Sequence, residues 1–275
     1  MVELAGTDLN NKDNAVDMAD VALTLREEAR RIGLQLFGDD AEKGASFADR
    51  LLGIYQDARG KDFLLIHNPG GWGNSPLENC MHWERSVVAG ISSTLEKLGY
   101  SWSLSQHFRA DAGWRAHLRD LRDYLHFFAV KRRVLAAEVE FLTEHLKNLK
   151  VILIGVSQGA GFSNAVMQRL SELQRVYSIE LGVFFFHRPR RVITERTLII
   201  DHNGLMPDAV IEGDLITMVM TLPMAFLRWV KNRLKGKPVK FSHCIKLAGH
   251  DYHWKYPKVS HQIRDFLKVN FGAKC

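Results

Sequence analysis

Two hydrophobic patterns recur along the chain, and each predicts a kind of element. Short continuous apolar runs are typical of strands that are covered on both faces, whereas apolar residues spaced three to four positions apart are typical of helices. Strands are predicted at 63–66, 102–106, 151–154, 181–186, 197–200 and 241–247. Helices are predicted as a pair within 15–58, and at 75–98, 114–149, 161–173, 215–234 and 258–271.

Strands that alternate with helices indicate an α/β fold, in which a doubly wound, mostly parallel sheet carries helices on its faces. Residues 62–275 contain all of the predicted strands and form the expected main domain. Residues 1–61 are expected to be an N-terminal helical extension that packs on this core. Sites in such folds lie at the carboxyl ends of the strands, so chemistry is expected just after each strand.

One helix start is marked by its own residues. The sequence Ser75-Pro76-Leu77-Glu78 has a capping residue, a proline suited to the first helical position, and a glutamate three residues after the serine. These features together predict that the helix begins at Ser75.

Composition excludes several classes of protein. The chain has 275 residues, of which 46% are hydrophobic, so it is neither disordered, collagen-like nor a disulfide scaffold. Its three cysteines, Cys80, Cys244 and Cys275, are too widely spaced for a disulfide framework or a CxxC metal site, which favours a reducing compartment. The N-terminus lacks the basic start and apolar run of a secretory signal. We therefore expect a cytoplasmic protein.

The net charge of the chain is only a weak indication of its binding partners. The 37 Lys and Arg exceed the 31 Asp and Glu by six, but they are scattered along the chain, and no nucleic-acid partner is expected. Three arginines, Arg188, Arg190 and Arg191, follow the predicted strand 181–186 and have two interpretations. They bind an anionic group of a substrate, or they belong to a solvated loop.

The strongest chemical motif follows the apolar run 151–154. Gly155-Val156-Ser157-Gln158-Gly159 matches G-x-S-x-G and precedes a predicted helix. A sharp turn from strand to helix strains the serine backbone and brings its flanking residues close to neighbouring backbone, which requires glycine. Such a turn would expose the hydroxyl of Ser157 above the sheet. We interpret Ser157 as a nucleophile in preference to a residue of a structural turn.

A serine hydroxyl needs a base within hydrogen-bond reach, and the base needs an orienting acid. His250 follows the predicted strand 241–247 and precedes the last helix, as the base should. The alternative is that His250 is a surface histidine, in which case the nearby His253 is the nearest competitor for the role.

The acid is expected a few residues beyond the strand 197–200. Asp208 lies in an Asp-x-Val context and is the first choice, while Asp201, at the end of the strand, is the second. Glu212 and Asp214 remain as further alternatives.

Hydrolysis of an acyl bond also needs backbone N–H donors for the oxyanion. The first predicted strand leads into the glycine-rich stretch HNPGGWG at 67–73. Pro69 has no N–H, so Gly70 and Gly71 are the candidate donors, together with Gln158 after the nucleophile. A plain surface turn would account for the same glycines.

These four elements occur in a fixed order over residues 62–272, and together they resemble the α/β-hydrolase-fold serine hydrolases of the esterase, lipase and thioesterase kind. The Ser-Gln-Gly sequence at 157–159 is similar to the cutinase-like, lipase and acyl-thioesterase branches. Two departures stand out. The loop contains His-Asn-Pro in place of the usual His-Gly, and the stretch 186–197 is too short for a long lid insertion.

The resemblance implies a hydrolase that cleaves a carboxylic ester or thioester through an acyl-enzyme on Ser157, with a small-molecule or lipid acyl ester as substrate. It implies no metal and no organic cofactor. Two alternatives stay open. The same residues could transfer the acyl group to an acceptor other than water, or the chain could be a catalytically silent binding protein.

The most apolar stretch of the chain, 215–227, has thirteen residues and is too short to cross a bilayer, which needs about 20. Its methionines suit a helix in the core. A second prediction is that 215–231 contacts a membrane surface or a second copy of the chain.

Overall fold

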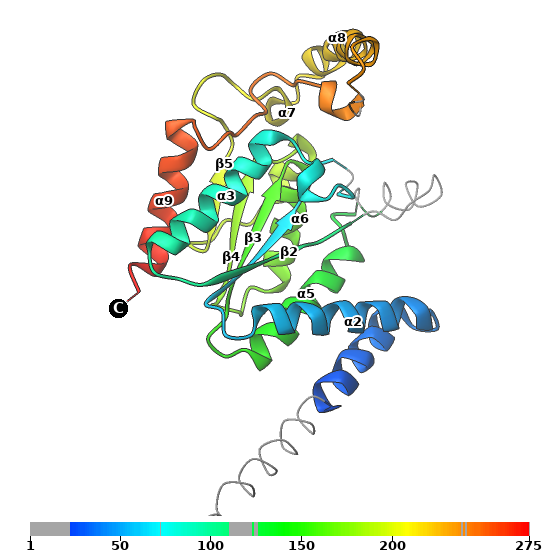
Figure 1. Cartoon of the computed structure of the whole chain (residues 1–275), viewed down its shortest axis with the longest axis vertical. Helices are drawn as coiled ribbons and strands as arrows, with labels where there is room; N and C mark the ends of the chain where they lie inside the picture. The colour runs from blue at the N-terminus through cyan, green and yellow to red at the C-terminus, as the bar shows by residue number, and fades with distance from the viewer. Residues whose placement is uncertain are drawn as a thin grey trace, which may run out of the picture. The chain divides into compact units, whose positions relative to one another are not determined.

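The computed structural model describes residues 23–71, 73–109, 123, 126–237, 239 and 241–274. The chain divides into two compact units, Met1–Arg59 and Gly60–Cys275, and the second holds every candidate site residue (Figure 1). This division falls close to the predicted boundary at 61. The packing of the first unit on the second stays a prediction.

The first unit contains the two predicted helices. One covers 23–37, and the other, α2, covers Ala41–Ala58. The side chain of Asp40 caps α2 by accepting a hydrogen bond from the backbone N–H of Lys43 at 3.2 Å. The helices approach closely at two glycines, because a Cβ on Gly33 would lie 2.5 Å from the carbonyl oxygen of Gly44. The predicted residues before position 23 lie outside the described part.

The second unit is built on a five-stranded sheet in the order β2-β1-β3-β4-β5. Every pairing between neighbouring strands is parallel, which confirms the predicted α/β class. The strands are β1 (Phe63–Asn68), β2 (Trp102–Gln106), β3 (Lys150–Val156), β4 (Val176–Leu181) and β5 (Thr197–Ile200).

The strand order reverses direction between β1 and β3. From β1 the chain moves to β2 on one side, and then returns to place β3 on the other side of β1. Asn68 at the end of β1 is level with Gly155 near the end of β3. In open α/β sheets ligands bind outside the carboxyl ends of the strands at such a reversal. The topology alone therefore directs attention to the ends of β1 and β3.

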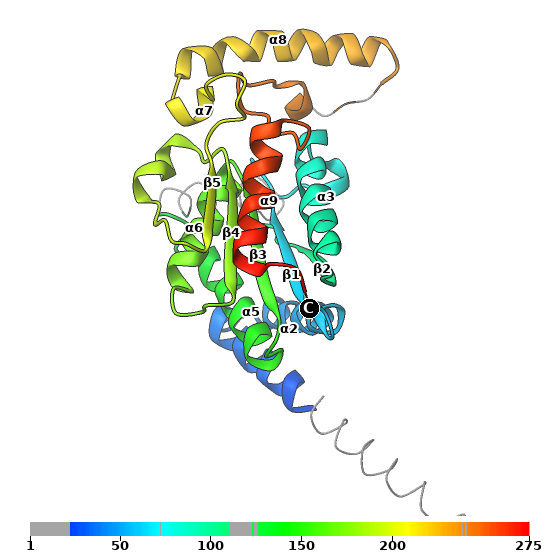
Figure 2. The same ribbon diagram turned by 90° about the vertical axis from the view of Figure 1, so that its left-hand side faces the viewer.

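Helices cover both faces of the sheet. One face carries α3 (His82–Lys97) and α9 (Pro257–Phe271), and the other carries α5 (Lys131–His145) and α6 (Gln158–Arg169) (Figure 2). The buried apolar core on the α3 and α9 face includes Phe63 and Leu65 from β1. Alternate residues of a strand share a face, so His67 points toward α3 and Asn68 toward α6. Asn68 Nδ2 indeed donates to Ser163 Oγ of α6 at 2.9 Å.

The predicted strand 181–186 is wrong in position, because β4 ends at Leu181. Gly182 has a positive φ of 57°, and Phe185–Arg190 form the 3₁₀ helix η2. The true strand was hidden by two polar residues. Ser178 and Glu180 are completely buried and hydrogen-bond each other at 3.1 Å, so polar side chains satisfied within the protein broke the apolar pattern.

The predicted strand 241–247 is also wrong. Phe241–Cys244 form the 3₁₀ helix η3, and the following residues up to His250 have no regular structure. A short run becomes a strand when a sheet partner is present. Here the segment packs against α8 (Leu215–Leu234), where the carbonyl oxygen of Cys244 accepts a hydrogen bond from Arg228 at 3.2 Å.

Two helix starts differ from the prediction. The Ser75 start is wrong: Leu77–Asn79 form the 3₁₀ helix η1, and α3 begins at His82 because the extended backbone of Cys80 interrupts the pattern. Conversely, α6 begins at Gln158, three residues earlier than predicted. Within the predicted helical stretch 114–149, the structure describes α5, and residues 114–122, 124 and 125 lie outside the described part.

Two helices lie beyond the carboxyl ends of the strands (Figure 2). The short α7 covers Ala209–Glu212, and α8 occupies the predicted range 215–234 without change. Among the helices that the structure describes, none is long and apolar enough to cross a membrane.

Candidate active site

Ser157 lies on the sharp turn that joins β3 to α6. Its backbone has φ 54° and ψ −115°, a conformation that residues other than glycine rarely adopt. The backbone is held there by its neighbours, since the N–H of Ser157 donates to the carbonyl oxygen of Leu181 at 2.8 Å, and its own carbonyl accepts from Ala160 at 3.0 Å. A strained residue fixed at the carboxyl end of a strand is typical of a functional position.

The glycines of the motif are required by close packing. A Cβ on Gly155 would lie 2.5 Å from the carbonyl oxygen of Gly159. A Cβ on Gly159 would lie 2.1 Å from the carbonyl oxygen of Asn68, at the end of β1. Any side chain at these positions would push the start of α6 away from the sheet. The turn therefore depends on both glycines, for the steric reason that the motif implies.

His250 and Asp208 form a hydrogen-bonded pair. His250 Nδ1 lies 2.7 Å from Asp208 Oδ2, and the two side chains are almost entirely buried. The start of α7 and the segment before His250 touch beside this pair: the N–H of Ala209 donates to the carbonyl oxygen of Ala248 at 3.1 Å. Gly249 makes this contact feasible, since a Cβ there would lie 2.0 Å from the carbonyl oxygen of Pro207.

Asp208 is kept ionised by its hydrogen bonds. Burial alone would raise the pKa of this carboxyl group, but hydrogen bonds from His250, Tyr252 and the backbone N–H of Val210 outweigh it, so the pKa lies below its usual value. Tyr252 donates its hydroxyl to the same oxygen as His250, and Val210 N–H donates to the other at 2.8 Å. Burial, reinforced by the charge of Asp208, raises the pKa of Tyr252, so this residue remains a donor.

The other candidate carboxylates have different partners. Asp201 forms a two-pronged ion pair with Arg191, at 2.9 and 2.6 Å. Asp214 caps α8 by accepting from the N–H of Thr217 at 3.0 Å. Glu212 is exposed and lies 4.0 Å from Arg188. Of the four carboxylates considered, Asp208 is the one that holds a histidine.

The competing histidine, His253, lies in a different environment. Its Nε2 is 3.1 Å from Nδ1 of His82, and its Nδ1 accepts from the N–H of Lys255 at 3.1 Å. Burial and the nearby charges of Lys255 and His82 lower the pKa of His253. No hydrogen bond joins the described atoms of His253 to a carboxylate, as a base in a triad would require.

Ser157 and His250 share a neighbour at the end of β4. The carbonyl oxygen of Leu181 accepts the hydrogen bond from the backbone N–H of Ser157. The next residue, Gly182, packs closely against His250, because a Cβ on this glycine would lie 2.9 Å from Cε1 of the imidazole ring. The same Cβ would lie 2.6 Å from Cε2 of Tyr252. The serine turn and the His–Asp pair, which come from three separate parts of the chain, thus both lie beside the end of β4.

The predicted oxyanion loop lies beside Ser157. A Cβ on Gly70 would be 3.7 Å from Cβ of Ser157, whereas one on Gly71 would meet nothing within 4 Å. Gln158 is the first residue of α6, directly after the serine. Gly70 and Gln158 are therefore close to the serine, and Gly71 stays a prediction with less support.

Arg109, which the sequence analysis missed, orients this loop. The guanidinium of this buried residue donates to the carbonyl oxygens of Pro69 at 2.7 Å and Gly71 at 3.0 Å. In a trans peptide the N–H points opposite to the carbonyl. The N–H of Gly70 consequently points away from Arg109. Nothing in the local sequence marks Arg109, which follows β2 by three residues.

A second group of side chains lies near the same loop, on the face of β1 that is covered by α3. His67, Cys80 and Glu84 are buried, and their donor atoms all lie within 4.8 Å of one another. Burial and the charge of Glu84 raise the pKa of the Cys80 thiol to about 12, which disfavours a nucleophilic role for it. Among the described residues, these three could hold a metal ion.

Comparison with known proteins finds likeness among solved structures. No protein-family model matches the chain, and no curated protein does so either. Among solved structures, it is similar to a Trichoderma reesei cutinase in complex with a C11Y4 phosphonate inhibitor. Identity is 15%, the TM-score is 0.44, and the alignment covers 94% of this chain and 98% of the cutinase chain. At these values the likeness assigns no substrate and no site residue, which must come from the chain's own geometry.

Proposed function

We propose that this chain is a serine hydrolase that cleaves a carboxylic ester or thioester, with Ser157 as nucleophile, His250 as base and Asp208 as the orienting acid. The observation that carries the proposal is the strained backbone of Ser157 at the sheet reversal, with the His250–Asp208 hydrogen bond at the same edge. These are the residue types and the connections that an activated serine needs. The resemblance to α/β-hydrolase-fold enzymes agrees with this assignment.

The hydrogen bond between His250 and Asp208 supports a direction for proton transfer. Since the ionised Asp208 accepts from Nδ1 of His250, Nε2 is left to accept the proton of Ser157 Oγ. The oxygen of Ser157 attacks the acyl carbon, and the alcohol or thiol leaves with the proton from Nε2. Water then attacks the acyl-enzyme, gives a proton to Nε2, and releases the acid and free Ser157.

The oxyanion that forms in each step needs donors beside Ser157. We assign the backbone N–H groups of Gln158 and Gly70 to this role, because one follows the serine and the other is turned away from Arg109. Gly71 is the alternative to Gly70. Tyr252 and Arg109 do not touch the reacting atoms in this scheme, and act by positioning Asp208 and the loop.

Apolar side chains support an acyl substrate. Phe186, Leu205 and Met206 are each more than half exposed, and they follow the carboxyl ends of β4 and β5. The nearby arginines have other partners, since Arg191 pairs with Asp201 and Arg188 lies near Glu212. This favours an uncharged acyl group over an anionic one.

A fluorophosphonate probe tests the nucleophile. Its phosphorus accepts the oxygen of an activated serine and loses fluoride. The wild-type chain should be labelled covalently, and Ser157→Ala should not, while Cys244→Ser, which removes a buried thiol elsewhere, should be labelled as wild type. Equal labelling of wild type and Ser157→Ala would overturn the assignment.

Product analysis separates the two alternatives. With p-nitrophenyl esters of rising chain length and matched thioesters, a hydrolase releases free acid, whereas an acyltransferase forms a new ester when an alcohol is added. A folded wild-type chain that neither reacts with the probe nor turns over any ester would favour a silent binding protein. The panel also ranks acyl chain lengths.

A second proposal concerns α8, which we infer binds an anionic lipid surface. Its outward side is apolar: Ile216, Met220 and Leu227 are exposed by 74%, 68% and 60%. These positions are four and seven residues apart and so share a face of the helix, while Ala225 is buried on the opposite side.

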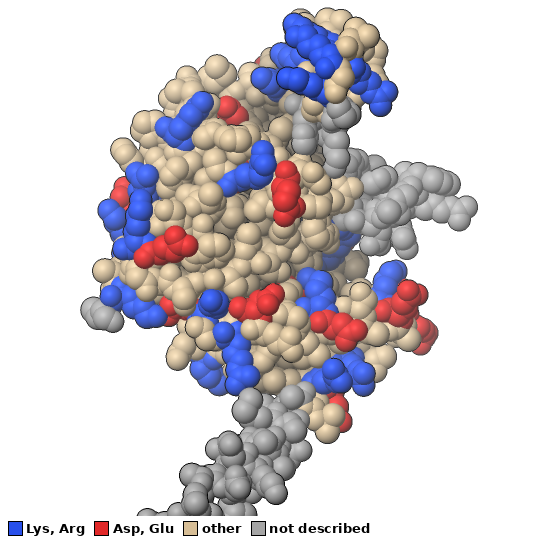
Figure 3. Space-filling model, viewed as in Figure 1, with Lys and Arg blue, Asp and Glu red and all other residues tan. Residues whose placement is uncertain are grey.

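The charged residues within α8 and in the segment that follows it are all basic. From residue 215 to residue 250 the sequence contains no Asp or Glu, but several Lys and Arg: Arg228, Lys231, Arg233, Lys235, Lys237, Lys240 and Lys246. Figure 3 shows Lys and Arg gathered over α8. An apolar helix face beside basic residues complements an anionic membrane interface, and each basic residue adds about 1 kcal/mol there.

Vesicle sedimentation tests this proposal. The chain should bind vesicles of phosphatidylglycerol and phosphatidylcholine, and bind much more weakly to phosphatidylcholine alone. Ile216→Ser should weaken binding, and Val269→Ser, at a position on α9 that is also highly exposed, should not. Equal binding to both vesicles would overturn the proposal, as would a dimer in lipid-free solution that Ile216→Ser dissociates, since α8 would then bind a second copy.

A further inference from the structure

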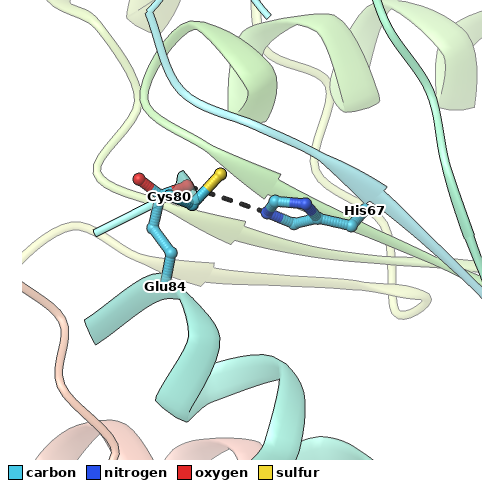
Figure 4. Close-up of side chains that lie close together, drawn as sticks. All are labelled: His67, Cys80 and Glu84. Atoms are coloured by element: carbon cyan, nitrogen blue, oxygen red, sulfur yellow. Dashed lines mark ion pairs between the residues drawn. The ribbon is translucent and has the colours of Figure 1, made fainter. Parts of the chain in front are cut away.

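His67, Cys80 and Glu84 come together from three elements around one loop. Figure 4 shows the ends of Cys80 and Glu84 lying together, toward one edge of the His67 ring. His67 is near the end of β1, Cys80 directly follows η1, and Glu84 lies in the first turn of α3. The alternation of β1 turns His67 toward α3, which explains how residues before and after the loop 68–79 meet.

The polar atoms of this cluster lack ordinary partners. His67 is completely buried, and neither of its ring nitrogens has a hydrogen bond. Oε2 of Glu84 also has no hydrogen bond, and it lies 3.7 Å from His67 Nε2. Cys80 Sγ lies 3.5 Å from the carbonyl oxygen of Ser75, and its thiol also interacts with the Glu84 carboxylate. Buried polar groups without partners are rare, because each costs about 1–3 kcal/mol.

A divalent cation would satisfy one ring nitrogen of His67, Oε2 of Glu84 and Sγ of Cys80 at once. A thiolate and a carboxylate supply two negative charges, and a neutral imidazole supplies a nitrogen lone pair, so the cluster matches a charge of +2. We propose that His67, Cys80 and Glu84 bind Zn²⁺. This mixed sulfur, nitrogen and oxygen set suits zinc, whereas Mg²⁺ and Ca²⁺ prefer oxygen ligands.

The spacing of the donor atoms agrees with zinc. Zinc bonds of about 2.0–2.3 Å in a tetrahedron place the ligand atoms about 3.3–3.7 Å apart. His67 Nε2 and Glu84 Oε2 already lie 3.7 Å apart, and every pair in the cluster is within 4.8 Å. Small side-chain rotations would complete the geometry. Three protein ligands leave the fourth position to water or another ligand.

The metal would clamp the loop 68–79. His67 precedes this loop and Cys80 follows it, so a shared ion fixes both of its ends. Gly70 belongs to the same loop and is held from the other side by the contacts of Arg109 with Pro69 and Gly71. Binding of the metal is independent of the proposed function, although its effect on Gly70 rests on that function.

Metal content and Co²⁺ spectroscopy test the proposal directly on the full chain. Purified wild-type protein, after dialysis against Zn²⁺ and gel filtration, should retain about one zinc per chain by mass spectrometry. With Co²⁺ in place of zinc, a thiolate-to-cobalt charge-transfer band and intense tetrahedral bands should appear. Cys80→Ser should abolish the charge-transfer band, and Glu84→Gln should weaken affinity about 100-fold. Cys244→Ser, which alters the other buried cysteine in the described part, should match wild type.

X-ray absorption of zinc-loaded wild-type protein provides a measurement that needs no variant. One sulfur at about 2.3 Å, with nitrogen or oxygen neighbours, is expected. Wild-type protein that retains no zinc, a zinc site without sulfur, or a charge-transfer band that persists in Cys80→Ser would each overturn the proposal. None of these results depends on ester hydrolysis, so failure of the metal site and failure of the proposed activity are distinguishable.

Discussion

Two apolar stretches of similar sequence character have opposite surroundings in this molecule. In β3, every residue from Val151 to Val156 is buried, and the strand has neighbours on both edges. In α8, a helix of 20 residues, most apolar side chains face outward, and Ala225 is buried. Hydrophobicity therefore predicted where an element forms in both stretches, but not what covers it.

The contrast extends to chemistry. The carboxyl end of β3 is fixed by steric contacts and hydrogen bonds that leave Ser157 in a strained conformation, and the adjacent end of β4 lies close to His250. Such strain persists when the surrounding structure holds it. The outward face of α8 contacts little within the chain, so we expect its residues to affect binding to an external surface more than folding.

The largest expected effect concerns the candidate site at the carboxyl end of β3. Asp208→Asn should lower kcat for ester hydrolysis by about 10³–10⁴-fold, because His250 loses the negative partner that orients its ring. Steady-state kinetics on a p-nitrophenyl ester measure this change. Asp201→Asn is the control and should keep most of the activity, since Asp201 pairs with Arg191. If the two variants exchange these results, Asp201 is the acid.

The second effect concerns steric fit. Gly159→Ala should lower the free energy of unfolding by more than about 3 kcal/mol, because its Cβ would lie 2.1 Å from the carbonyl oxygen of Asn68. Gly236→Ala, just after α8, has open space around it and should cost only about 1 kcal/mol for its positive φ. Urea denaturation compares the two. Equal losses of unfolding free energy in the two variants would mean that the carboxyl end of β3 is less tightly packed than its distances indicate.

The third effect depends on pH. Burial, opposed by hydrogen bonds from Asn164 and Ser178, raises the pKa of Glu180 to about 7. The native state therefore favours the protonated form, and its contribution to stability, complete below pH 4.5, is lost as pH rises through about 7. Glu180→Gln should stabilise the fold by about 1–3 kcal/mol at pH 8 and have little effect at pH 4.

Denaturation midpoints at the two pH values measure this difference. The exposed Glu195→Gln serves as control and should show no such pH dependence. A Glu180→Gln variant that is equally destabilised at both pH values would show that Glu180 acts through its hydrogen bonds alone.

The smallest expected effect concerns the exposed face of α8. Ile216→Ser in α8 should change the free energy of unfolding by no more than about 0.5 kcal/mol, because this side chain is 74% exposed. Ile154→Ser in β3, which is fully buried, should cost several kcal/mol. A large loss for Ile216→Ser would mean that α8 contributes to the folded core, and would remove the contrast between the two stretches.

Much of the fold could be predicted from local pattern. The continuous run at β3, the helix at α8 and the last helix α9 were predicted within a few residues, since their periodicity agrees with their final structure. The errors arose where long-range contacts outweighed the pattern. Buried hydrogen bonds conceal β4 in the sequence, and contact with α8 keeps 241–247 out of the sheet.

The candidate site was predicted in part for the same reason. Ser157 is marked by glycines that a sharp turn requires locally, so the motif was visible in the sequence. Tyr252 and Arg109 were missed because their roles depend on contacts with residues 44 and 40 positions away along the chain. The partners that support the choice of Asp208 over Asp201, which are His250 and Arg191, likewise come from contacts that the local sequence does not show.

The sequence by itself determined the α/β class, the turn at Ser157 and the order of the candidate residues, because backbone sterics and hydrophobic periodicity act over a few neighbouring positions. The tertiary structure alone decided which carboxylate holds His250, what surrounds α8, and that Cys80 lies with His67 and Glu84. Those three residues have no recognisable spacing in the sequence. They meet because a parallel strand, a loop and a helix bring distant positions together, and such proximity depends on the packing of the whole unit.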